Sequence, residues 1–439
     1  MTFCKVLIFG QPFNNFTGGG ITLTNLFKGW PKDKIAVAYM GHGLYNVSTD
    51  VCDTVYQLGY EEHRWVFPFS VIQRKFPSGL KKYDPEKKPA FNFIQTGTRY
   101  KIVTRFFYPF LRWTGIYHFL SKIHISERFA NFLEEFKPDL LYLQVSTRDE
   151  IIFSIDLIKH LKIPSIIHMM DDWPSTISRQ GLFHKSIEKR IDRELKALFN
   201  VVDLHLSISD AMSSAYSERY KKNFIAFHNP IETSSWLPFS KNDYPIRKER
   251  VSVLYSGRIG MGITESIYEV AEAIDRMNLN GSKIDLHIQT PTKDEGILNQ
   301  LRKYKCIIIN PFAELSQLPM IFSNADILLL ANDFSDHALD YLRLSMPTKA
   351  SEYMVSGTPV LIYSPEETAV TKFFKENECG YCVTLQDQNE IIKAFEYLIN
   401  NEEYRRKTGS RANEIARTRF SADKVRKEFQ ELLLAQLNK

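Results

Sequence analysis

Short apolar runs alternate with amphipathic stretches along most of the chain, and this alternation limits the possible folds most strongly. The runs are continuous, as expected for strands buried on both faces of a parallel sheet. Helix-like stretches such as 150–161 and 263–277 lie between them. We therefore predict an α/β protein with two doubly wound, Rossmann-like domains. The runs form two series: 5–9, 35–39, 140–145, 165–169 and 204–208, then 251–255, 284–288, 306–309, 327–330 and 360–363.

The length of the chain also favours two domains, because 439 residues exceed what one hydrophobic core usually supports. Prolines and polar residues interrupt the pattern between the two series. Doubly wound sheets bind ligands beyond the carboxyl ends of their strands, so we expect a substrate cleft between the halves. The predicted division is a first domain over 1–230, a linker over 231–250, a second domain over 251–420 and a final amphipathic helix over 421–439.

The composition is that of a globular protein, with 44% hydrophobic and 24% charged residues. The apolar run that ends at Phe9 is short and resembles a first strand more than a signal peptide. No segment approaches the roughly 18 apolar residues of a spanning helix, so we expect a cytoplasmic location. A net charge of only +5 and the lack of a recognised motif argue against a nucleic-acid partner.

Five cysteines, an odd number, suggest no disulfide framework. Cys379 and Cys382 have redox-motif spacing, but they precede a predicted strand, and no second cysteine pair or nearby histidine completes a zinc site. We predict that these thiols only pack in the interior, and we predict no metal site.

The segment 345–363 reads as a loop, a short charged helix and a buried strand. Ser345 is a plausible N-cap and Pro347 suits the first turn, so free amide groups would face an anion such as a diphosphate. Steps of four and three residues place Ser345, Lys349 and Glu352 on one stripe. Lys349 would contact a phosphate and Glu352 would accept hydrogen bonds from two ribose hydroxyls. The alternative is an exposed Lys–Glu pair with no ligand.

Several motifs occur in one order: Gly18-Gly-Gly20, His168 with Asp171-Asp-Trp173, Ser256-Gly-Arg258, Asn324 to Leu330, and Pro347 to Tyr353 followed by Gly357-Thr-Pro-Val360. This series resembles GT-B glycosyltransferases, particularly the retaining glycosyltransferase family four. The resemblance implies two Rossmann-like domains that face a cleft, and a C-terminal helix that crosses back between them. It also implies a nucleotide diphosphate sugar of the UDP or GDP type as co-substrate, with no other cofactor.

The resemblance implies which residues bind the donor. Arg258 would hold the diphosphate and, with Lys349, stabilise the leaving group; a surface ion pair is the alternative for Arg258. The implied donor-binding residues are Gly19, Gly20, Gly257, Arg258, Asn310, Phe312, Ser345, Thr348, Lys349 and Glu352.

Two positions depart from the family pattern. Ile263 stands where a lysine is common, so Lys349 or Arg343 would supply the second positive charge. Leu344 replaces the earlier of two paired glutamates, and contacts to the donor sugar would then come from the loop 331–343. The candidates there are Asp333, Asp336, His337 and Asp340.

The glycine triplet does not fit a dinucleotide fingerprint, because Gln11 and Pro12 follow Gly10 and the triplet comes eight residues later. A longer loop that brings the backbone amides of Gly18 to Gly20 near a phosphate or sugar fits better. A plain turn remains the alternative.

His168 and the acids after it follow a predicted strand and should therefore protrude into the cleft. His168 resembles the family's histidine beside the reacting sugar, and Asp171 or Asp172 could orient or deprotonate an acceptor hydroxyl. The alternative is a core histidine, with Asp172 capping a helix that starts at Trp173-Pro174.

The segment 99–128 mixes basic and aromatic residues, a composition that suits the interface of an anionic membrane. Such a surface would meet a lipid-linked acceptor at the inner face of the cytoplasmic membrane. A buried helical pair inside the first domain is the alternative.

Together these features predict a metal-independent glycosyltransferase that moves a sugar to a cell-envelope glycan or a lipid-linked acceptor, with retention. A nucleotide-sugar epimerase of the same fold is the alternative among enzymes. A non-catalytic two-domain sugar-binding protein is the alternative outside them.

Overall fold

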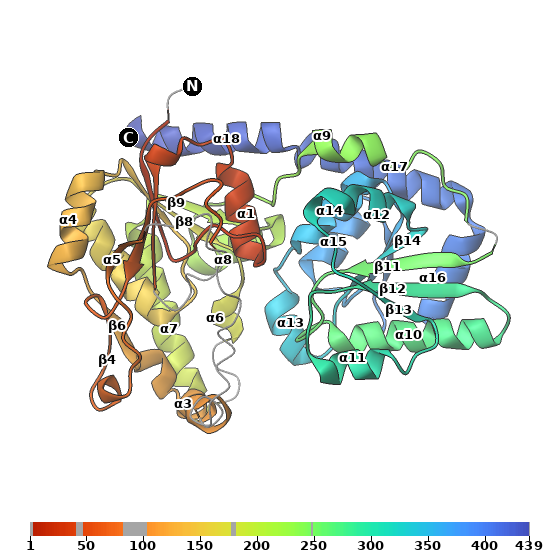
Figure 1. The fold of residues 1–439 in the computed structure, drawn as a ribbon, viewed down its shortest axis with the longest axis horizontal. Helices are drawn as coiled ribbons and strands as arrows, with labels where there is room; N and C mark the ends of the chain where they lie inside the picture. The colour runs from red at the N-terminus through yellow and green to blue at the C-terminus, as the bar shows by residue number, and fades with distance from the viewer. Residues whose placement is uncertain (1–2, 41–46, 82–102, 177–180, 247–248, 439) are drawn as a thin grey trace. The chain divides into compact units, whose positions relative to one another are not determined.

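The computed structural model describes all residues except 1–2, 41–46, 82–102, 177–180, 247–248 and 439 (Figure 1). The chain divides into two compact units. The first comprises Met1–Phe227 and Glu428–Lys439, and the second comprises His228–Lys427.

The first unit is built on an eight-stranded sheet with the order β10-β9-β8-β7-β1-β2-β3-β5, parallel except for β5. The chain order reverses between β1 and β7, which creates a switch point there. A separate antiparallel pair joins β4 and β6. The strands are β1 Val6–Phe9, β2 Ile35–Met40, β3 Val55–Leu58, β4 His63–Trp65, β5 Gly79–Lys81, β6 Ser121–Ile123, β7 Leu140–Leu143, β8 Ser165–Met169, β9 Leu204–Ser207 and β10 Phe224–Ala226.

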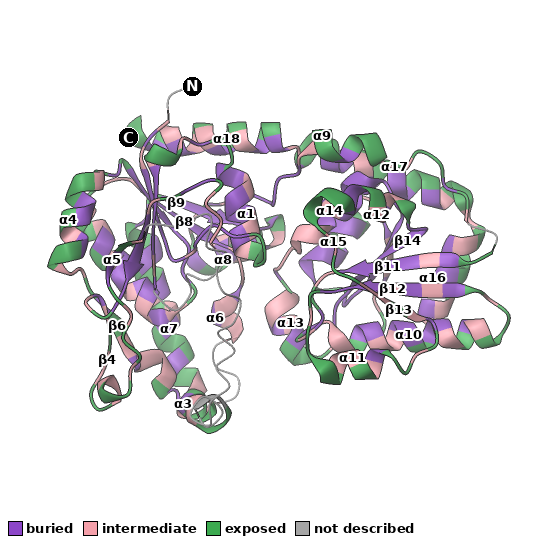
Figure 2. Cartoon of the chain, in the orientation of Figure 1, coloured by how far each residue is buried: buried purple, intermediate pink, exposed green. Residues whose placement is uncertain are grey.

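The five strands predicted for this half are therefore confirmed within two residues at each end. Their burial explains the signal, because β1, β7 and β8 are buried at every position (Figure 2). The helices of this unit are α1 Gly18–Phe27, α3 Tyr108–Thr114, α4 Glu127–Phe136, α5 Arg148–Leu161, α6 Trp173–Thr176, α7 His184–Val201 and α8 Asp210–Tyr220.

The second unit has a six-stranded sheet, parallel throughout, with the order β13-β12-β11-β14-β15-β16. Its switch point lies between β11 and β14. All five strands of the predicted series are confirmed. The strand that we predicted after Cys382 is β16, which already begins at Tyr381 and therefore contains Cys382. The strands are β11 Val251–Ser256, β12 Ile284–Gln289, β13 Ile307–Asn310, β14 Ile327–Ala331, β15 Val360–Tyr363 and β16 Tyr381–Val383.

Helices pack on both faces of this sheet and form two apolar clusters with it. Each longer helix turns one buried stripe inwards (Figure 2). The helices are α9 Thr233–Trp236, α10 Thr264–Leu279, α11 Glu295–Leu301, α12 Leu318–Asn324, α13 Asp336–Leu342, α14 Thr348–Ser356, α15 Ala369–Glu376, α16 Gln388–Asn400 and α17 Glu402–Arg419.

Within 231–250, which we expected to link the domains, Trp236, Ser240 and Lys241 make contacts inside the second unit. Trp236 is buried in one of its apolar clusters. Ser240 Oγ donates to the carbonyl of Val355 at 2.9 Å, and the amide of Lys241 donates to Ser356 at 2.8 Å. These contacts tie the start of the unit to the end of α14.

The last long helix, α18 (Ala422–Ala435), begins in the second unit and ends in the first. Within the first unit, Phe429 is fully buried, with its ring 5.2 Å from Phe27, 6.0 Å from Tyr142 and 5.4 Å from Phe227. The predicted crossing helix is therefore confirmed.

The cysteine prediction also holds. Cys379 is buried in an apolar cluster of the second unit and Cys382 packs against the same cluster. Burial raises the pKa of both thiols to about 12, which keeps them protonated and unreactive at neutral pH.

Candidate functional site

The loop after β11 approaches the switch point of the second unit. Gly257 has a φ of 146°, and its amide donates to the carbonyl of Gln289 at 2.9 Å. The buried hydroxyl of Tyr255 donates to the carbonyl of Arg258 at 2.7 Å. These bonds fix the backbone of the loop and leave the Arg258 side chain exposed. Its guanidinium has no acceptor among the residues that the structure describes.

Helix α14 brings Lys349 to the same loop. Its Nζ lies 3.9 Å from the centroid of the Tyr255 ring, a cation–π contact. A Cβ added at Gly257 would come within 3.0 Å of this Nζ, so the glycine leaves the room that the lysine occupies. Glu352 follows one helical turn later and, like Lys349, is half-buried. The predicted grouping of Gly257, Arg258, Lys349 and Glu352 is thus present as a cluster in three dimensions.

The surroundings of this cluster are costly for charge. Burial lowers the pKa of Lys349 to about 7; Glu352 opposes this effect and Arg258 adds to it. Burial also raises the pKa of Glu352 to about 7, against the opposing effect of Lys349. An anion that bound beside Lys349 and Arg258 would relieve the cost of the two positive charges.

A second tyrosine joins the two parts of this cluster. The hydroxyl of Tyr353 accepts a hydrogen bond from the amide of Ser256 at 2.9 Å. Tyr353 is fully buried and directly follows Glu352, while Ser256 directly precedes Gly257. The sequence analysis missed both Tyr255 and Tyr353; the only available signal was an aromatic residue beside each charged motif.

The start of α14 differs from the prediction. Ser345 is not its N-cap, because its hydroxyl donates to the carbonyl of Tyr341 at 2.8 Å and so closes the end of α13. The N-cap is Pro347, which has no side-chain capping bond, and Thr348 is the first helical residue. Ser345 therefore lies off the stripe that carries Lys349. Proline at the cap fixes an extended backbone, and this preference outweighs the capping tendency of a serine two residues earlier.

The predicted loop 331–343 is partly helical, since α13 covers Asp336–Leu342. Asp333 is buried and accepts a hydrogen bond from the amide of Ser266 at 2.8 Å, which anchors the start of α10. Asp340 is buried as well, and Leu344 lies in the interior. The exposed candidates are Asp336 and His337.

Asn310 and Phe312 line a groove of about 950 Å³ that follows β12 and passes beside α12. Asn310 ends β13, and its Nδ2 lies 3.1 Å from Nδ1 of His287. Phe312 is more than half exposed. Arg258, Lys349 and Glu352 do not line this groove.

In the first unit the glycine triplet forms the first turn of α1 instead of a long loop. Thr17 caps this helix by accepting from the amide of Gly20 at 3.1 Å. A Cβ at Gly20 would meet Asn14 at 2.2 Å, whereas one at Gly19 would only reach ordinary contact with Gln11 and Met170. Packing at Gly20, not a positive φ, explains this glycine. Gly19 leaves backbone accessible near the loop after β8.

His168 lies at the carboxyl end of β8 and is buried. Its Nδ1 is 2.5 Å from the hydroxyl of Tyr142, a fully buried residue of the neighbouring strand β7. Burial raises the pKa of Tyr142 far above its ordinary value, so the phenol keeps its proton. A protonated phenol can donate to Nδ1, which would leave the proton of the imidazole on Nε2.

The two acids after His168 differ in their surroundings. Asp172 is buried; its Oδ1 accepts from Tyr216 at 2.8 Å and its Oδ2 from Ser175 at 2.7 Å. These bonds hold the start of α6 and favour the capping interpretation for Asp172. Asp171 is half-buried beside it.

No helix of the described part of the chain is long and apolar enough to cross a membrane. In the same residues, no three His, Cys, Asp or Glu side chains gather in an arrangement that could hold a metal ion.

Residues 239–415, all within the second unit, match the family model described as glycosyl transferases group 1. This segment is therefore similar to glycosyl transferases of group 1. The match covers less than half of the chain, and no curated protein matched the sequence.

Solved structures match almost the whole chain. Anabaena HepE in complex with UDP and glucose has a TM-score of 0.60 at 12% identity, over 98% of this chain and 100% of that one. Sucrose-phosphate synthase from Thermosynechococcus elongatus has 0.61 at 13%, over 97% of both chains. WaaG, a glycosyltransferase involved in lipopolysaccharide biosynthesis, has 0.57 at 11%, over 98% and 99%. The chain has the GT-B fold.

Proposed function

We propose that this protein is a glycosyltransferase that moves a sugar from a nucleotide diphosphate sugar to an acceptor hydroxyl. The observation that carries the proposal is the cluster around Gly257, where Lys349 lies over Tyr255 at 3.9 Å and Arg258 extends from the same loop. Two cations can hold a diphosphate, and the carboxylate of Glu352 can accept from two ribose hydroxyls.

In the proposed reaction, the bond between the anomeric carbon and the β-phosphate oxygen breaks while the acceptor oxygen bonds to the same carbon, with retention overall. Negative charge grows on the departing diphosphate, and Arg258 and Lys349 stabilise it without a metal ion. The acceptor hydroxyl loses its proton, for which Asp171 is the proposed base. His168 would contact the reacting sugar.

The proposed donor is a UDP sugar. HepE was solved with UDP and glucose, and further structures of it contain UDP or UDP-glucose. The proposed acceptor is a cell-envelope glycan or a lipid-linked sugar, which the similarity in fold to WaaG supports. No cofactor other than the nucleotide sugar is proposed.

The test measures binding and turnover with UDP and GDP sugars. We expect UDP to raise the melting temperature, because a ligand that binds only the folded state stabilises it. Arg258→Ala should lower turnover on the order of 100-fold, the effect of removing one electrostatic donor. Arg302→Ala is the matched control, since Arg302 is exposed on the same unit and pairs with Glu295 at 3.3 Å.

Other results would contradict the proposal. A product in which the sugar is epimerised but still bonded to the nucleotide would identify an epimerase. Binding of the nucleotide sugar without release of a nucleotide would identify a sugar-binding protein. Activity that disappears in chelator and returns with manganese would overturn metal independence. The anomeric configuration of the product tests retention.

A further inference from the structure

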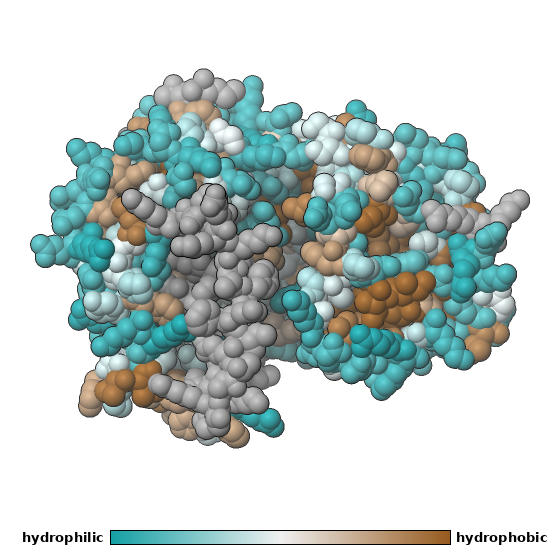
Figure 3. Space-filling model, viewed as in Figure 1, coloured by the Kyte–Doolittle hydropathy of each residue, from teal (hydrophilic) through white to brown (hydrophobic). Residues whose placement is uncertain are grey.

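Large apolar side chains gather at one end of the first unit, and they come from three separate segments. We call this surface the apolar tip; it comprises Phe67, Val71, Phe106, Phe110, Trp113 and Phe183, all exposed. Figure 3 shows brown and tan atoms at the lower end of this unit, where Figure 1 places β4 and α3. Exposed apolar patches of this kind are uncommon on proteins that have no partner there.

Contacts between the segments show that the tip is one surface. The rings of Phe69 and Phe107 lie 6.0 Å apart, which joins the short helix Phe69–Val71 to the π-helical segment Val103–Phe107 before α3. The amide of Leu182 donates to the carbonyl of Trp113 at 2.8 Å, which brings in the third segment. The sequence analysis named only the segment 99–128, of which 99–102 lie outside the described residues.

The tip is not the buried helical pair that the sequence allowed as an alternative. In α3 only Leu111 is buried, while Phe110 and Trp113 are each more than half exposed. An exposed aromatic side chain of this size gains free energy when it enters an apolar environment.

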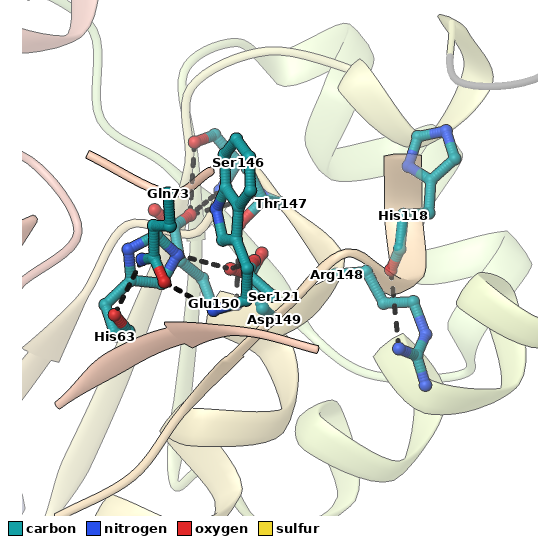
Figure 4. A network of polar contacts seen from close by, with 10 residues as sticks. His63, Gln73, His118, Ser121, Ser146, Thr147, Arg148, Asp149 and Glu150 are labelled. Atoms are coloured by element: carbon teal, nitrogen blue, oxygen red, sulfur yellow. Dashed lines mark hydrogen bonds and ion pairs between the residues drawn. The ribbon is translucent and has the colours of Figure 1, made fainter. Parts of the chain in front are cut away.

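Figure 4 shows a network of polar contacts around β4, β6 and the start of α5. Gln73 accepts from the amide of Trp65 at 2.7 Å and donates to the carbonyl of His63 at 2.9 Å, which closes the first segment on itself. Ser121 donates to Asp149 at 2.6 Å, which ties β6 to the start of α5. Side-chain hydrogen bonds therefore hold the first segment of the tip against β4, and β6 against the start of α5.

The charges around the tip point to the partner. The segments 64–76, 105–116 and 181–189 contain seven basic residues and one acidic residue, Glu188. All seven basic side chains are exposed. Basic residues around aromatic and aliphatic side chains are the arrangement that binds a bilayer with anionic lipids, such as the cytoplasmic leaflet.

We propose that the apolar tip inserts into the surface of an anionic membrane and holds the protein there as a peripheral protein. Phe110, Trp113 and Phe183 enter the interface between headgroups and acyl chains, while Arg105 and Arg112 contact lipid phosphates. This proposal does not depend on the sugar-transfer reaction, since the tip is remote in sequence from every residue of the second unit that is assigned to the donor.

The test uses the whole protein with vesicles that contain about one third phosphatidylglycerol in phosphatidylcholine, against pure phosphatidylcholine. We expect sedimentation with the anionic vesicles only, and a blue shift of Trp113 fluorescence that Trp113→Phe removes. Phe110→Ser/Trp113→Ser/Phe183→Ser should reduce partitioning at least about tenfold. Arg105→Glu/Arg112→Glu should reduce it about 25-fold or more at low salt, and less at high salt.

The matched control is Met261→Ser/Leu279→Ser/Leu385→Ser, which removes three exposed apolar side chains of the second unit. It should bind vesicles like the wild type, and all variants should keep the wild-type affinity for UDP and melting temperature. No sedimentation of the wild type, or an equal loss in the control, would overturn the proposal. So would a dimer in sedimentation velocity that the tip variant converts to a monomer, which would assign the tip to a second copy.

Discussion

Lys349 illustrates how a single residue can combine a structural cost with a function. Its amine lies over the Tyr255 ring, and burial lowers its pKa while burial raises that of Glu352. Desolvation of two ionisable groups is expensive when nothing neutralises them. If the proposed donor binds here, its diphosphate would offset this cost, because the anion would lie beside Lys349 and Arg258.

The two pKa shifts predict how stability depends on pH. Between pH 4.5 and about 7 the folded state keeps a proton on Glu352 that the unfolded chain releases, so stability falls as pH rises. Between about 7 and 10.5 the unfolded chain keeps a proton on Lys349 that the folded state lacks, so stability rises. The pair therefore contributes a minimum of stability near pH 7.

Lys349→Met/Glu352→Leu should remove this minimum and stabilise the ligand-free protein at pH 7 by about 1 kcal/mol, while UDP binding is lost. Urea unfolding at pH 5, 7 and 9 checks the difference between variant and wild type. Lys303→Met/Glu295→Leu, a change at exposed residues of the same unit, is the control. If the difference in the free energy of unfolding between the double variant and the wild type is the same at all three pH values, the predicted minimum near pH 7 is wrong.

At the scale of elements, the candidate donor site depends on the pairing of β11 with α14. The Gly257 loop follows β11, and α14 carries Lys349 and Glu352. The amide of Ser256, at the end of β11, donates to the hydroxyl of Tyr353 on α14. This hydrogen bond is buried, where the loss of its acceptor would leave the amide of Ser256 unpaired at a cost in free energy.

Tyr353→Phe should leave the Ser256 amide without its partner and lower the free energy of unfolding by about 1 to 3 kcal/mol. It should also weaken UDP binding, because the Gly257 loop and α14 lose the hydrogen bond that fixes their relative position. Tyr363→Phe is the control. Tyr363 lies on β15, in the same sheet as β11, and its hydroxyl donates to Glu269 away from the cluster. Calorimetric titration with UDP compares the two variants; equal affinities would show that the contact serves stability alone.

At the scale of the whole molecule, α18 makes the first unit depend on the end of the chain. Its ring Phe429 fills a position against Phe27, Tyr142 and Phe227, so the core of residues 1–227 is completed by residue 429. Tyr142 also contacts His168, the candidate acceptor-side histidine. Tyr142 is therefore the one residue that separates Phe429 of α18 from His168 in this chain of contacts.

Phe429→Ala should therefore destabilise the first unit by about 3 to 5 kcal/mol, the usual cost of removing a buried phenylalanine. The second unit contains its own core and should unfold as in the wild type. Hydrogen exchange of the β7 and β14 amides separates the two effects. Leu437→Ala, at a partly exposed site near the same end, should change neither. Equal loss of protection in both strands would refute the assignment of Phe429 to the first unit.

Much of the fold could be predicted from the sequence, because strands buried on both faces must be continuously apolar. The runs at β1, β8 and β15 are four or five residues long, which favours strands over helices, and parallel strands joined by helices imply doubly wound sheets. At β16 only Val383 is buried, so the composition marks its start poorly: we placed the strand after Cys382, whereas it begins at Tyr381.

The sequence alone determined which charged residues are available for a donor, since Lys349, Glu352 and Arg258 stand in motifs whose spacing is local. Only the tertiary structure decided how they meet. Gly257 leaves room for Lys349, and Ser345 closes α13 instead of capping α14. The carboxylate of Asp172 accepts hydrogen bonds from Tyr216 and Ser175. Periodicity specifies which face of a helix or strand is buried. Contacts between segments distant in the chain carry no local signal, so the packing of Lys349 on Tyr255 and of three separate segments in the apolar tip arises only when the chain is folded.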